Sequence, residues 1–197
     1  MEEQRENRRV QMTKRLMKDA LLELLEQREL SNISVTAICE TADVHRSTFY
    51  KHYKDPADLM RDLEQDYLDR IPLPSQPPNR QSQELLLDET STFFDFVKQN
   101  ERAFRIFFGE PTSSGFAARL IKLLSSKYSA PVENDGETTS HYARLYVANG
   151  TVGMLREWVN AGFPVSSREI AEMMYLFSVR VSSEQRAFSV AVSESPE

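Results

Sequence analysis

Several residue types and patterns are scarce in this sequence of 197 residues, and each scarcity excludes a class of protein. The single cysteine, Cys39, excludes an internal disulfide framework and a metal site built from several cysteines. Only six glycines occur, and no alternation of apolar and polar residues indicates strands. No apolar run approaches the ~20 residues of a membrane span, and the polar start MEEQR is unlike a signal peptide. We therefore expect an all-α, cytoplasmic protein that does not contact a membrane.

Signals for catalysis or metal binding are also weak. His45 and His52 are seven residues apart, which separates them by ~10 Å along a helix, too far for one metal ion. No glycine-rich phosphate loop, nucleophile elbow or His-Glu metal motif occurs. Gly150 and Gly153 form a GxxG pattern, but inside a predicted helix, where close helix approach explains them. We expect no metal, no cofactor and no enzymatic activity.

The charge of the chain is unevenly distributed. The net charge is −6, yet residues 1–54 hold ten Lys and Arg against nine Asp and Glu, and the remainder holds fourteen against twenty-one. The basic residues of the first part gather near its two ends: Arg5, Arg8, Arg9, Lys14, Arg15 and Lys18, and then Arg46, Lys51 and Lys54. A locally positive end on an acidic body is compatible with phosphate binding.

A proline-rich segment divides the chain. Residues 71–82 read IPLPSQPPNRQS, and four prolines in twelve residues predict an extended linker. Helical spacing before it predicts helices at 10–28, about 34–41, 46–53 and 56–70, and after it near 83–100, 101–108, 116–128, 140–161 and 167–182. We predict a domain over 9–70, a regulatory and dimerisation domain over 83–183, and a tail over 184–197.

Capping residues support these boundaries. Ser34 is a suitable N-cap, and Asp55 before Pro56 predicts a helix start. Gly162 with Phe163 and Pro164 ends the long helix, and Ser166 or Ser167 caps the next one.

Residues 34–53, SVTAICETADVHRSTFYKHY, predict a helix-turn-helix, whose second helix enters the major groove. Its apolar positions are spaced to pack inward. The positions left exposed on the second helix all donate hydrogen bonds, and none is acidic: His45, Arg46, Ser47, Thr48, Tyr50, Lys51 and His52. Such a face is suited to phosphates and base edges.

The stretch ICETADVHRSTFYKHYKDPADL closely resembles the DNA-binding signature of the TetR family of repressors, and residues from about 9 to 70 fit that domain. The matching positions are Ile38, Ala42, Val44, Thr48, Phe49, Tyr50, His52 and Tyr53. Three positions depart. Asp43 replaces a usual Gly but tolerates a left-handed turn, His45 replaces a capping Ser, and Pro56 replaces a phosphate-binding Lys, whose charge we expect Lys54 to supply.

The resemblance implies double-stranded DNA as the partner and a role for each residue. Tyr50, His52 and Lys54 would hold phosphates, Thr36 and Arg15 would approach the backbone, and Arg46, Ser47 and Thr48 would face bases or nearby backbone. Phe49 and Tyr53 would be core. The implied DNA-binding set is Arg15, Thr36, His45, Arg46, Ser47, Thr48, Tyr50, His52 and Lys54.

The C-terminal stretch YARLYVANGTVGMLREWVNAGFPVSSREIAEMMYLFS resembles more weakly a TetR subgroup that includes the dihydroxyacetone kinase regulators. Aromatic residues there could form a helical core or line a pocket for a small apolar ligand. The candidate lining residues are Phe93, Phe96, Phe104, Phe108, Tyr146, Met154 and Trp158.

The helix at 140–161 is apolar nearly all round and must be covered on every side. We therefore predict a two-fold homodimer through this helix and the next. The predicted interface comprises Gly150, Gly153, Ile170, Met173, Met174 and Phe177. Three functions stay open: a DNA-binding regulator, expected to act as a repressor, that answers to a ligand; one controlled by a partner protein; and an enzyme or a helical binding module that does not bind DNA.

Overall fold

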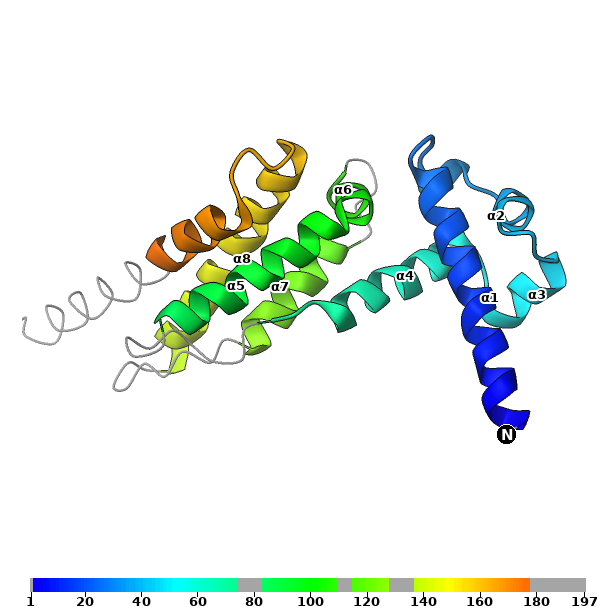
Figure 1. Ribbon diagram of the computed structural model, residues 1–197, viewed down its shortest axis with the longest axis horizontal. Coiled ribbons are helices and arrows are strands. Elements are labelled where there is room, and N and C mark those ends of the chain that lie inside the picture. The colour runs from blue at the N-terminus through cyan, green and yellow to red at the C-terminus, as the bar shows by residue number, and fades with distance from the viewer. Residues whose placement is uncertain (1, 74–82, 110–114, 128–136, 178–197) are drawn as a thin grey trace, which may run out of the picture. The chain divides into compact units, whose positions relative to one another are not determined.

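The computed structural model describes residues 2–73, 83–109, 115–127 and 137–177, and every regular element within them is a helix (Figure 1). The elements are α1 (Glu2–Leu25), the short 3-10 turn η1 (Leu30–Asn32), α2 (Val35–Ala42), α3 (Arg46–His52), α4 (Pro56–Arg70), α5 (Gln83–Gln99), α6 (Glu101–Phe108), α7 (Phe116–Lys127) and α8 (Glu137–Asn160). Residues 167–177 are also helical. The all-α prediction is confirmed, and the main difference is that α1 begins eight residues earlier than expected.

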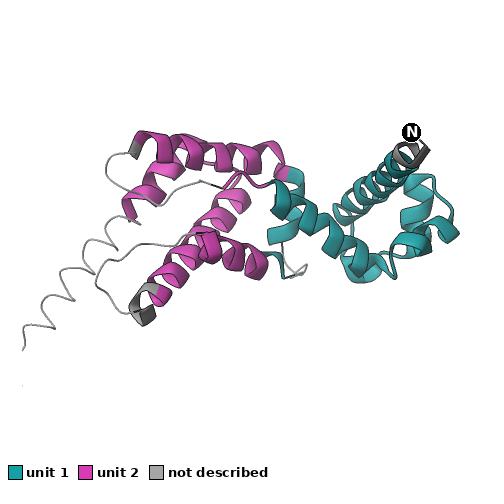
Figure 2. Cartoon of the chain, turned by 90° about the horizontal axis from the view of Figure 1, so that it is seen from below, with its two compact units in different colours: residues 1–70, 102–116 teal, residues 71–101, 117–197 magenta. Residues whose placement is uncertain are grey.

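The chain forms two compact units (Figure 2). Unit 1 combines residues 1–70 with 102–116, and unit 2 combines 71–101 with 117–197. Most of the predicted linker (74–82), the end of the last predicted helix (178–182) and the predicted tail lie outside the described residues. Within the described residues, no helix is long and apolar enough to cross a membrane.

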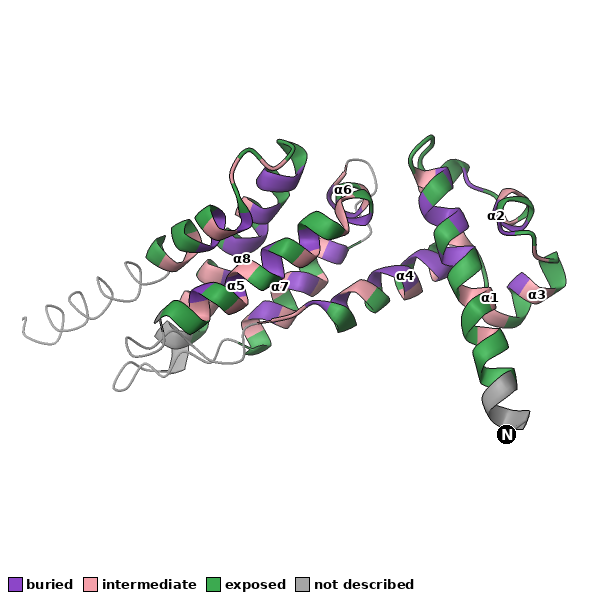
Figure 3. Cartoon of the chain, in the orientation of Figure 1, coloured by how far each residue is buried: buried purple, intermediate pink, exposed green. Residues whose placement is uncertain are grey.

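The helix-turn-helix part of unit 1 is built on α1. This helix packs against α2 and α4, and α2 packs against α3. Met17 and Leu21, one helical turn apart, are fully buried, as is Phe49 of α3. Because Phe49 anchors α3 by one face, the opposite face of this short helix is left to solvent (Figure 3).

An aromatic cluster forms a second core in unit 1. The Phe107 and Phe116 rings stack with centroids 4.6 Å apart, and Tyr67 of α4 meets Phe107 edge-on at 5.2 Å. Phe104 is fully buried and contacts the rings of Tyr67 and Phe116. These edge-to-face and offset contacts attach α6 to the C-terminal half of α4.

Unit 2 is centred on Trp158 of α8. Its ring lies edge-on to Phe94 of α5, with centroids 5.2 Å apart, and to Phe163 at 4.7 Å. The end of α8 has the hydrogen bonds of a Schellman motif, because the N–H of Phe163 donates to the Trp158 carbonyl and that of Gly162 to the Val159 carbonyl. Gly162 adopts φ +76°, a left-handed conformation that glycine adopts without steric cost. The predicted helix end is confirmed.

The turn between α8 and the helix at 167–177 is held by hydrogen bonds at both of its ends. The indole Nε1 of Trp158 donates to the Val165 carbonyl at 3.0 Å. Ser166 Oγ accepts from the Glu169 N–H, and the Glu169 carboxylate accepts from the Ser166 N–H at 2.8 Å. This reciprocal pair is a capping box, so Ser166 is the cap of the helix at 167–177.

Candidate nucleic-acid interface

The turn between α2 and α3 has the geometry that the sequence predicts. Ser34 Oγ accepts a hydrogen bond from the Ala37 N–H at 3.1 Å and caps α2. Asp43 ends α2 at φ 53° and ψ 48°, in the left-handed region. The Val44 N–H then donates to the Cys39 carbonyl at 3.0 Å. Asp43 therefore adopts the left-handed turn conformation that the sequence analysis predicts for it.

The start of α3 is less well capped. His45 occupies the N-cap position in an extended conformation, and its side chain makes no capping hydrogen bond. The weaker cap that the sequence predicts at this position is confirmed. Phe49 and Tyr53 are buried, as expected of core residues.

The exposed face of α3 carries hydrogen-bond donors and positive charge. His45, Arg46, Ser47, Tyr50 and Lys51 are exposed. Thr48 and His52 are half-buried. Within the described parts of the chain, neither Arg46 nor Lys51 forms an ion pair, so both cations are available to an anionic partner.

The connection from α3 to α4 fixes the backbone of Lys54. The Lys54 N–H donates to Asp58 Oδ2 at 3.0 Å, and the Asp58 N–H donates to Asp55 Oδ1 at 2.7 Å. The hydrogen bond from Lys54 is the main reason that the pKa of Asp58 is lowered, and Arg61 adds to it. The exposed Lys54 side chain is thus carried by a hydrogen-bonded turn, and Pro56 starts α4 without needing a partner for an N–H.

The two remaining candidates lie on other helices of unit 1. Thr36 is exposed in the first turn of α2. Arg15 is exposed on α1, with its Nε 3.8 Å from the similarly exposed Asp19 carboxylate. Such a surface pair is weak, so it does not hold Arg15 away from another anion. All nine predicted DNA-binding residues therefore belong to unit 1 and are accessible to solvent.

A partly buried ionic network joins the end of α3 to α1 and α4, and the sequence analysis does not predict it. Lys18 Nζ lies 2.8 Å from Asp62 Oδ2 and also pairs with Asp66, while the Tyr53 hydroxyl donates to Asp62 Oδ2 at 2.7 Å. Lys14 Nζ lies 5.5 Å from the centroid of the Tyr53 ring and 3.9 Å from Asp62. The network therefore joins α1, α4 and the end of α3.

This network changes the interpretation of the basic cluster on α1. Lys18 belongs to that cluster in the sequence, but it is only 8% exposed and is neutralised by two carboxylates, so it does not meet phosphate. One feature of the sequence could have predicted these ion pairs. Lys14 and Lys18 are four residues apart on one helix, and Asp62 and Asp66 are four residues apart on the other.

The network also shifts the pKa values of Tyr53 and Asp62. Burial, and then the hydrogen bond to Asp62, raise the pKa of Tyr53. Partial burial alone would raise the pKa of Asp62, but hydrogen bonds from Lys18 and Tyr53 outweigh it and lower that pKa.

The residues predicted to line a ligand pocket fall in both units. Phe104 and Phe108 are buried in the aromatic cluster of unit 1, each against Phe116. In unit 2, Phe93 contacts Phe94, which in turn contacts Trp158, and all three are buried. These side chains therefore take part in core packing within their own units.

The other three predicted lining residues are less enclosed. Phe96 and Met154 are half-buried, whereas Tyr146 is 66% exposed and lies on the surface of unit 2 rather than in its interior. The spacing on α8 explains this, because Tyr146 shares its helix face with the exposed Tyr142 and Gly150.

The predicted interface residues are mostly exposed in the single chain. Gly150 and Gly153 lie on the outer surface of α8, where an added Cβ would meet nothing within 4 Å. Met173 and Phe177 are 40% and 50% exposed, and Met174 is half-buried. Ile170 differs from the other predicted interface residues, because it is 5% exposed and belongs to the core of unit 2 in the single chain.

Residues 86–178 match the family model TetR_C_8, described as the transcriptional regulator C-terminal region. No curated protein matches the chain. The helical fold, with its helix-turn-helix and helical C-terminal part, is also found in solved structures of TetR-type transcriptional regulators. Residues 86–178 thus match the C-terminal region of TetR-type transcriptional regulators, and the fold of the chain is shared with solved TetR-family structures.

Solved structures share the fold at low sequence identity. The dihydroxyacetone kinase operon activator DhaS is 15% identical with a TM-score of 0.62, over 85% of this chain and 94% of DhaS. A TetR regulator from Streptococcus agalactiae is 18% identical with a TM-score of 0.64, over 88% and 97%. NalD of Pseudomonas aeruginosa, a secondary repressor of the MexAB-OprM multidrug efflux pump, is 18% identical with a TM-score of 0.57, over 87% and 97%.

Proposed function

We propose that two copies of this chain bind a pseudo-palindromic DNA operator through α3 and repress transcription until a small apolar ligand releases them. The exposed face of α3 carries the proposal. It presents the cations Arg46 and Lys51 and the hydroxyls of Ser47 and Tyr50, with no carboxylate on the helix. In a solvated surface helix, acidic side chains would normally be mixed among these residues.

The residues divide by the kind of contact they would make. We assign Tyr50, His52 and Lys54 to phosphates and Arg46, Ser47 and Thr48 to base edges or nearby backbone. Phosphate contacts supply most of the affinity and carry little sequence information, whereas base contacts discriminate among sequences. Arg15, Thr36 and His45 would complete the backbone contacts from the neighbouring helices.

A two-fold dimer would allow two copies of this surface to bind one DNA duplex together. Two copies of α3 would meet successive major grooves ~34 Å apart, which matches a pseudo-palindromic site. The apolar side chains of Met173 and Phe177 and the open space beside Gly150 support an interface at α8 and residues 167–177.

Control by a small ligand is the second part of the proposal. A ligand would have to favour an arrangement that does not bind DNA, because it shifts an equilibrium only by its differential affinity. Control by a partner protein is the alternative. The names of the structural relatives include both an activator and a repressor, so they favour neither direction of regulation.

The test compares two sets of variants on duplexes derived from the genomic fragment that the wild-type protein binds best. Tyr50→Phe with Lys54→Ala should weaken binding to every duplex about equally. Arg46→Ala or Thr48→Ala should change the preference among duplexes by about 1–3 kcal/mol for each hydrogen-bonded pairing with a base that the substitution removes.

All these variants should keep the wild-type melting temperature, because the altered side chains are largely solvent-exposed or only half-buried. Full affinity in the Tyr50/Lys54 double variant would contradict the assignment. A rise in melting temperature with an added small molecule would separate ligand control from partner control.

A further inference from the structure

The N-terminal half of α1 extends beyond the part of unit 1 that supports it. Lys14, in the middle of α1, lies over the ring of Tyr53 at the end of α3. Arg8 is six residues earlier, hence ~9 Å further along the helix axis. From Glu6 to Met12, no described side chain forms an ion pair or a hydrogen bond with another helix.

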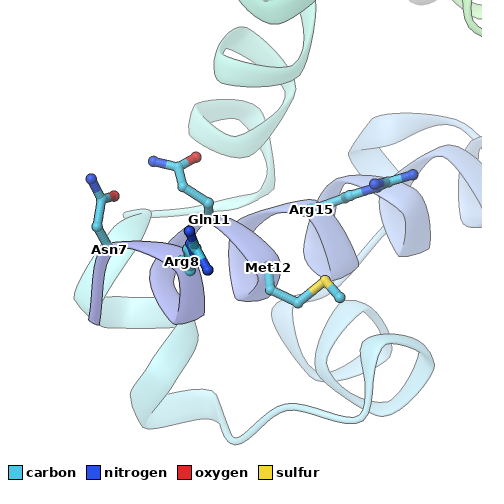
Figure 4. A pocket seen from close by; sticks show the side chains of 5 residues that line it. All are labelled: Asn7, Arg8, Gln11, Met12 and Arg15. Atoms are coloured by element: carbon cyan, nitrogen blue, oxygen red, sulfur yellow. The ribbon is translucent and has the colours of Figure 1, made fainter. Parts of the chain in front are cut away.

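The outer face of this extension is basic and partly apolar. An open hollow along α1 is lined by Asn7, Arg8, Gln11, Met12 and Arg15 (Figure 4). Met12 is 59% exposed and adds an apolar side chain to this face. The hollow therefore combines two guanidinium groups, two amides and one apolar side chain, and no carboxylate is among its described lining residues.

The nearest acidic residue in the sequence does not share this face. Glu6 precedes Arg8 by two residues, which places the two side chains on nearly opposite sides of the helix. Arg8 and Arg9 have no ion-pair partner among the described residues, and Arg15 has only the weak pair with Asp19. The positive charge of this face is therefore not neutralised within the part of the chain that the structure describes.

We propose that this face of α1, from Asn7 to Arg15, is an arm that binds the sugar–phosphate backbone of DNA outside the sequence contacted by α3. The proposal rests on the proposed function and deepens it. Guanidinium and amide groups donate to phosphate oxygens, and Met12 can pack against a deoxyribose. The occupant is duplex DNA because the charge is complementary and because α1 meets the end of α3, where Lys14 lies over the Tyr53 ring.

The experiment uses two duplexes and the full-length protein. One duplex ends at the outermost base pairs of the protected operator, and the other extends it by about one helical turn, ~10 base pairs, on each side. The arm predicts that the wild type binds the extended duplex more tightly, by roughly tenfold, and that Arg8→Gln removes this gain.

Two matched variants complete the design. Arg28→Gln removes the same charge from an exposed arginine just beyond the other end of α1, one without an ion pair among the described residues, and should bind both duplexes as the wild type does. Arg8→Lys keeps the charge and should retain most of the gain. On the extended duplex, Arg8→Gln should reduce the slope of log affinity against log salt by about 2, one phosphate per protomer.

The outcomes separate the arm from the function beneath it. Equal binding of Arg8→Gln and the wild type to the extended duplex overturns the arm but leaves reading by α3 intact. A gain that depends on the flanking sequence overturns the assignment to phosphates. A change in sedimentation of Arg8→Gln without DNA would overturn the arm and make the face an interface between copies. A wild type that binds no duplex at all would refute the proposed function itself.

Discussion

The hydroxyl of Tyr53 donates to Asp62 Oδ2 at 2.7 Å and ties the end of α3 to the middle of α4. The same carboxylate oxygen accepts from Lys18 of α1 at 2.8 Å. The Asp62 carboxylate of α4 therefore links α1 to the end of α3, and these contacts help to orient the exposed face of α3. The contact involves a charged acceptor that is partly shielded from water, where such hydrogen bonds contribute more than at a free surface.

Tyr53→Phe should lower the free energy of unfolding by about 1–2 kcal/mol, because Asp62 loses one donor while Lys18 still neutralises it. The measurement is urea unfolding of the full-length protein. Tyr50→Phe is the matched control, since Tyr50 is 54% exposed and its hydroxyl supports no described contact between helices. It should leave stability unchanged while weakening DNA binding. Equal stability losses in both variants would contradict the role of the hydrogen bond between Tyr53 and Asp62.

Asp62 should make stability depend on acidity. Its pKa in the folded protein is lowered from the ordinary value of 3.8, so it stays ionised in the folded chain at a pH where the unfolded chain already binds a proton. Its contribution is therefore fully present above about pH 4 and is lost as pH falls through the lowered pKa. Asp62→Asn should unfold more easily at neutral pH and show a shallower loss of stability between about pH 4 and pH 2. An acid limb as steep as in the wild type would refute this.

Gly162→Ala should destabilise the end of α8 by about 1 kcal/mol, because alanine meets steric hindrance in the left-handed conformation that Gly162 adopts at φ +76°. Gly150→Ala is the comparison within the same helix. Gly150 is helical with open space around it in the single chain, so alanine there gains helix propensity. Thermal unfolding at a low protein concentration distinguishes the two. Gly162→Ala at or above wild-type stability would contradict the strained position.

The exposed apolar side chains of Met173 and Phe177 predict that the chain forms a dimer. Met173→Glu with Phe177→Glu should yield monomers or aggregates, and operator affinity should collapse although no proposed DNA contact is altered. Leu85→Glu is the control, because Leu85 is 57% exposed on α5 and is not among the predicted interface residues. Sedimentation at micromolar concentration measures the effect. A wild-type protein that sediments as a monomer would disprove the interface, as would a double variant that remains dimeric.

Much of the local structure follows from residue types whose effects act over a few positions. Ser34, Asp55 and Ser166 each cap a helix where the sequence predicts one, and Asp43 adopts the expected left-handed turn. The burial of Phe49 and Tyr53 follows from their spacing alone. These predictions hold because a cap, a turn or an amphipathic stripe needs only neighbours within one or two helical turns.

The remaining features depend on which segments meet. Lys18 looks like a surface cation in the sequence, yet α4 brings Asp62 and Asp66 against it and removes it from the candidate phosphate contacts. Ile170 shares an apolar helix stripe with Met173, Met174 and Phe177, yet it is buried within unit 2. Tyr146, which the sequence analysis places in a ligand pocket, is exposed. Helical periodicity defines which side chains share a face, but only tertiary packing decides which side of a wide apolar helix is covered within one chain and which remains open to a second molecule.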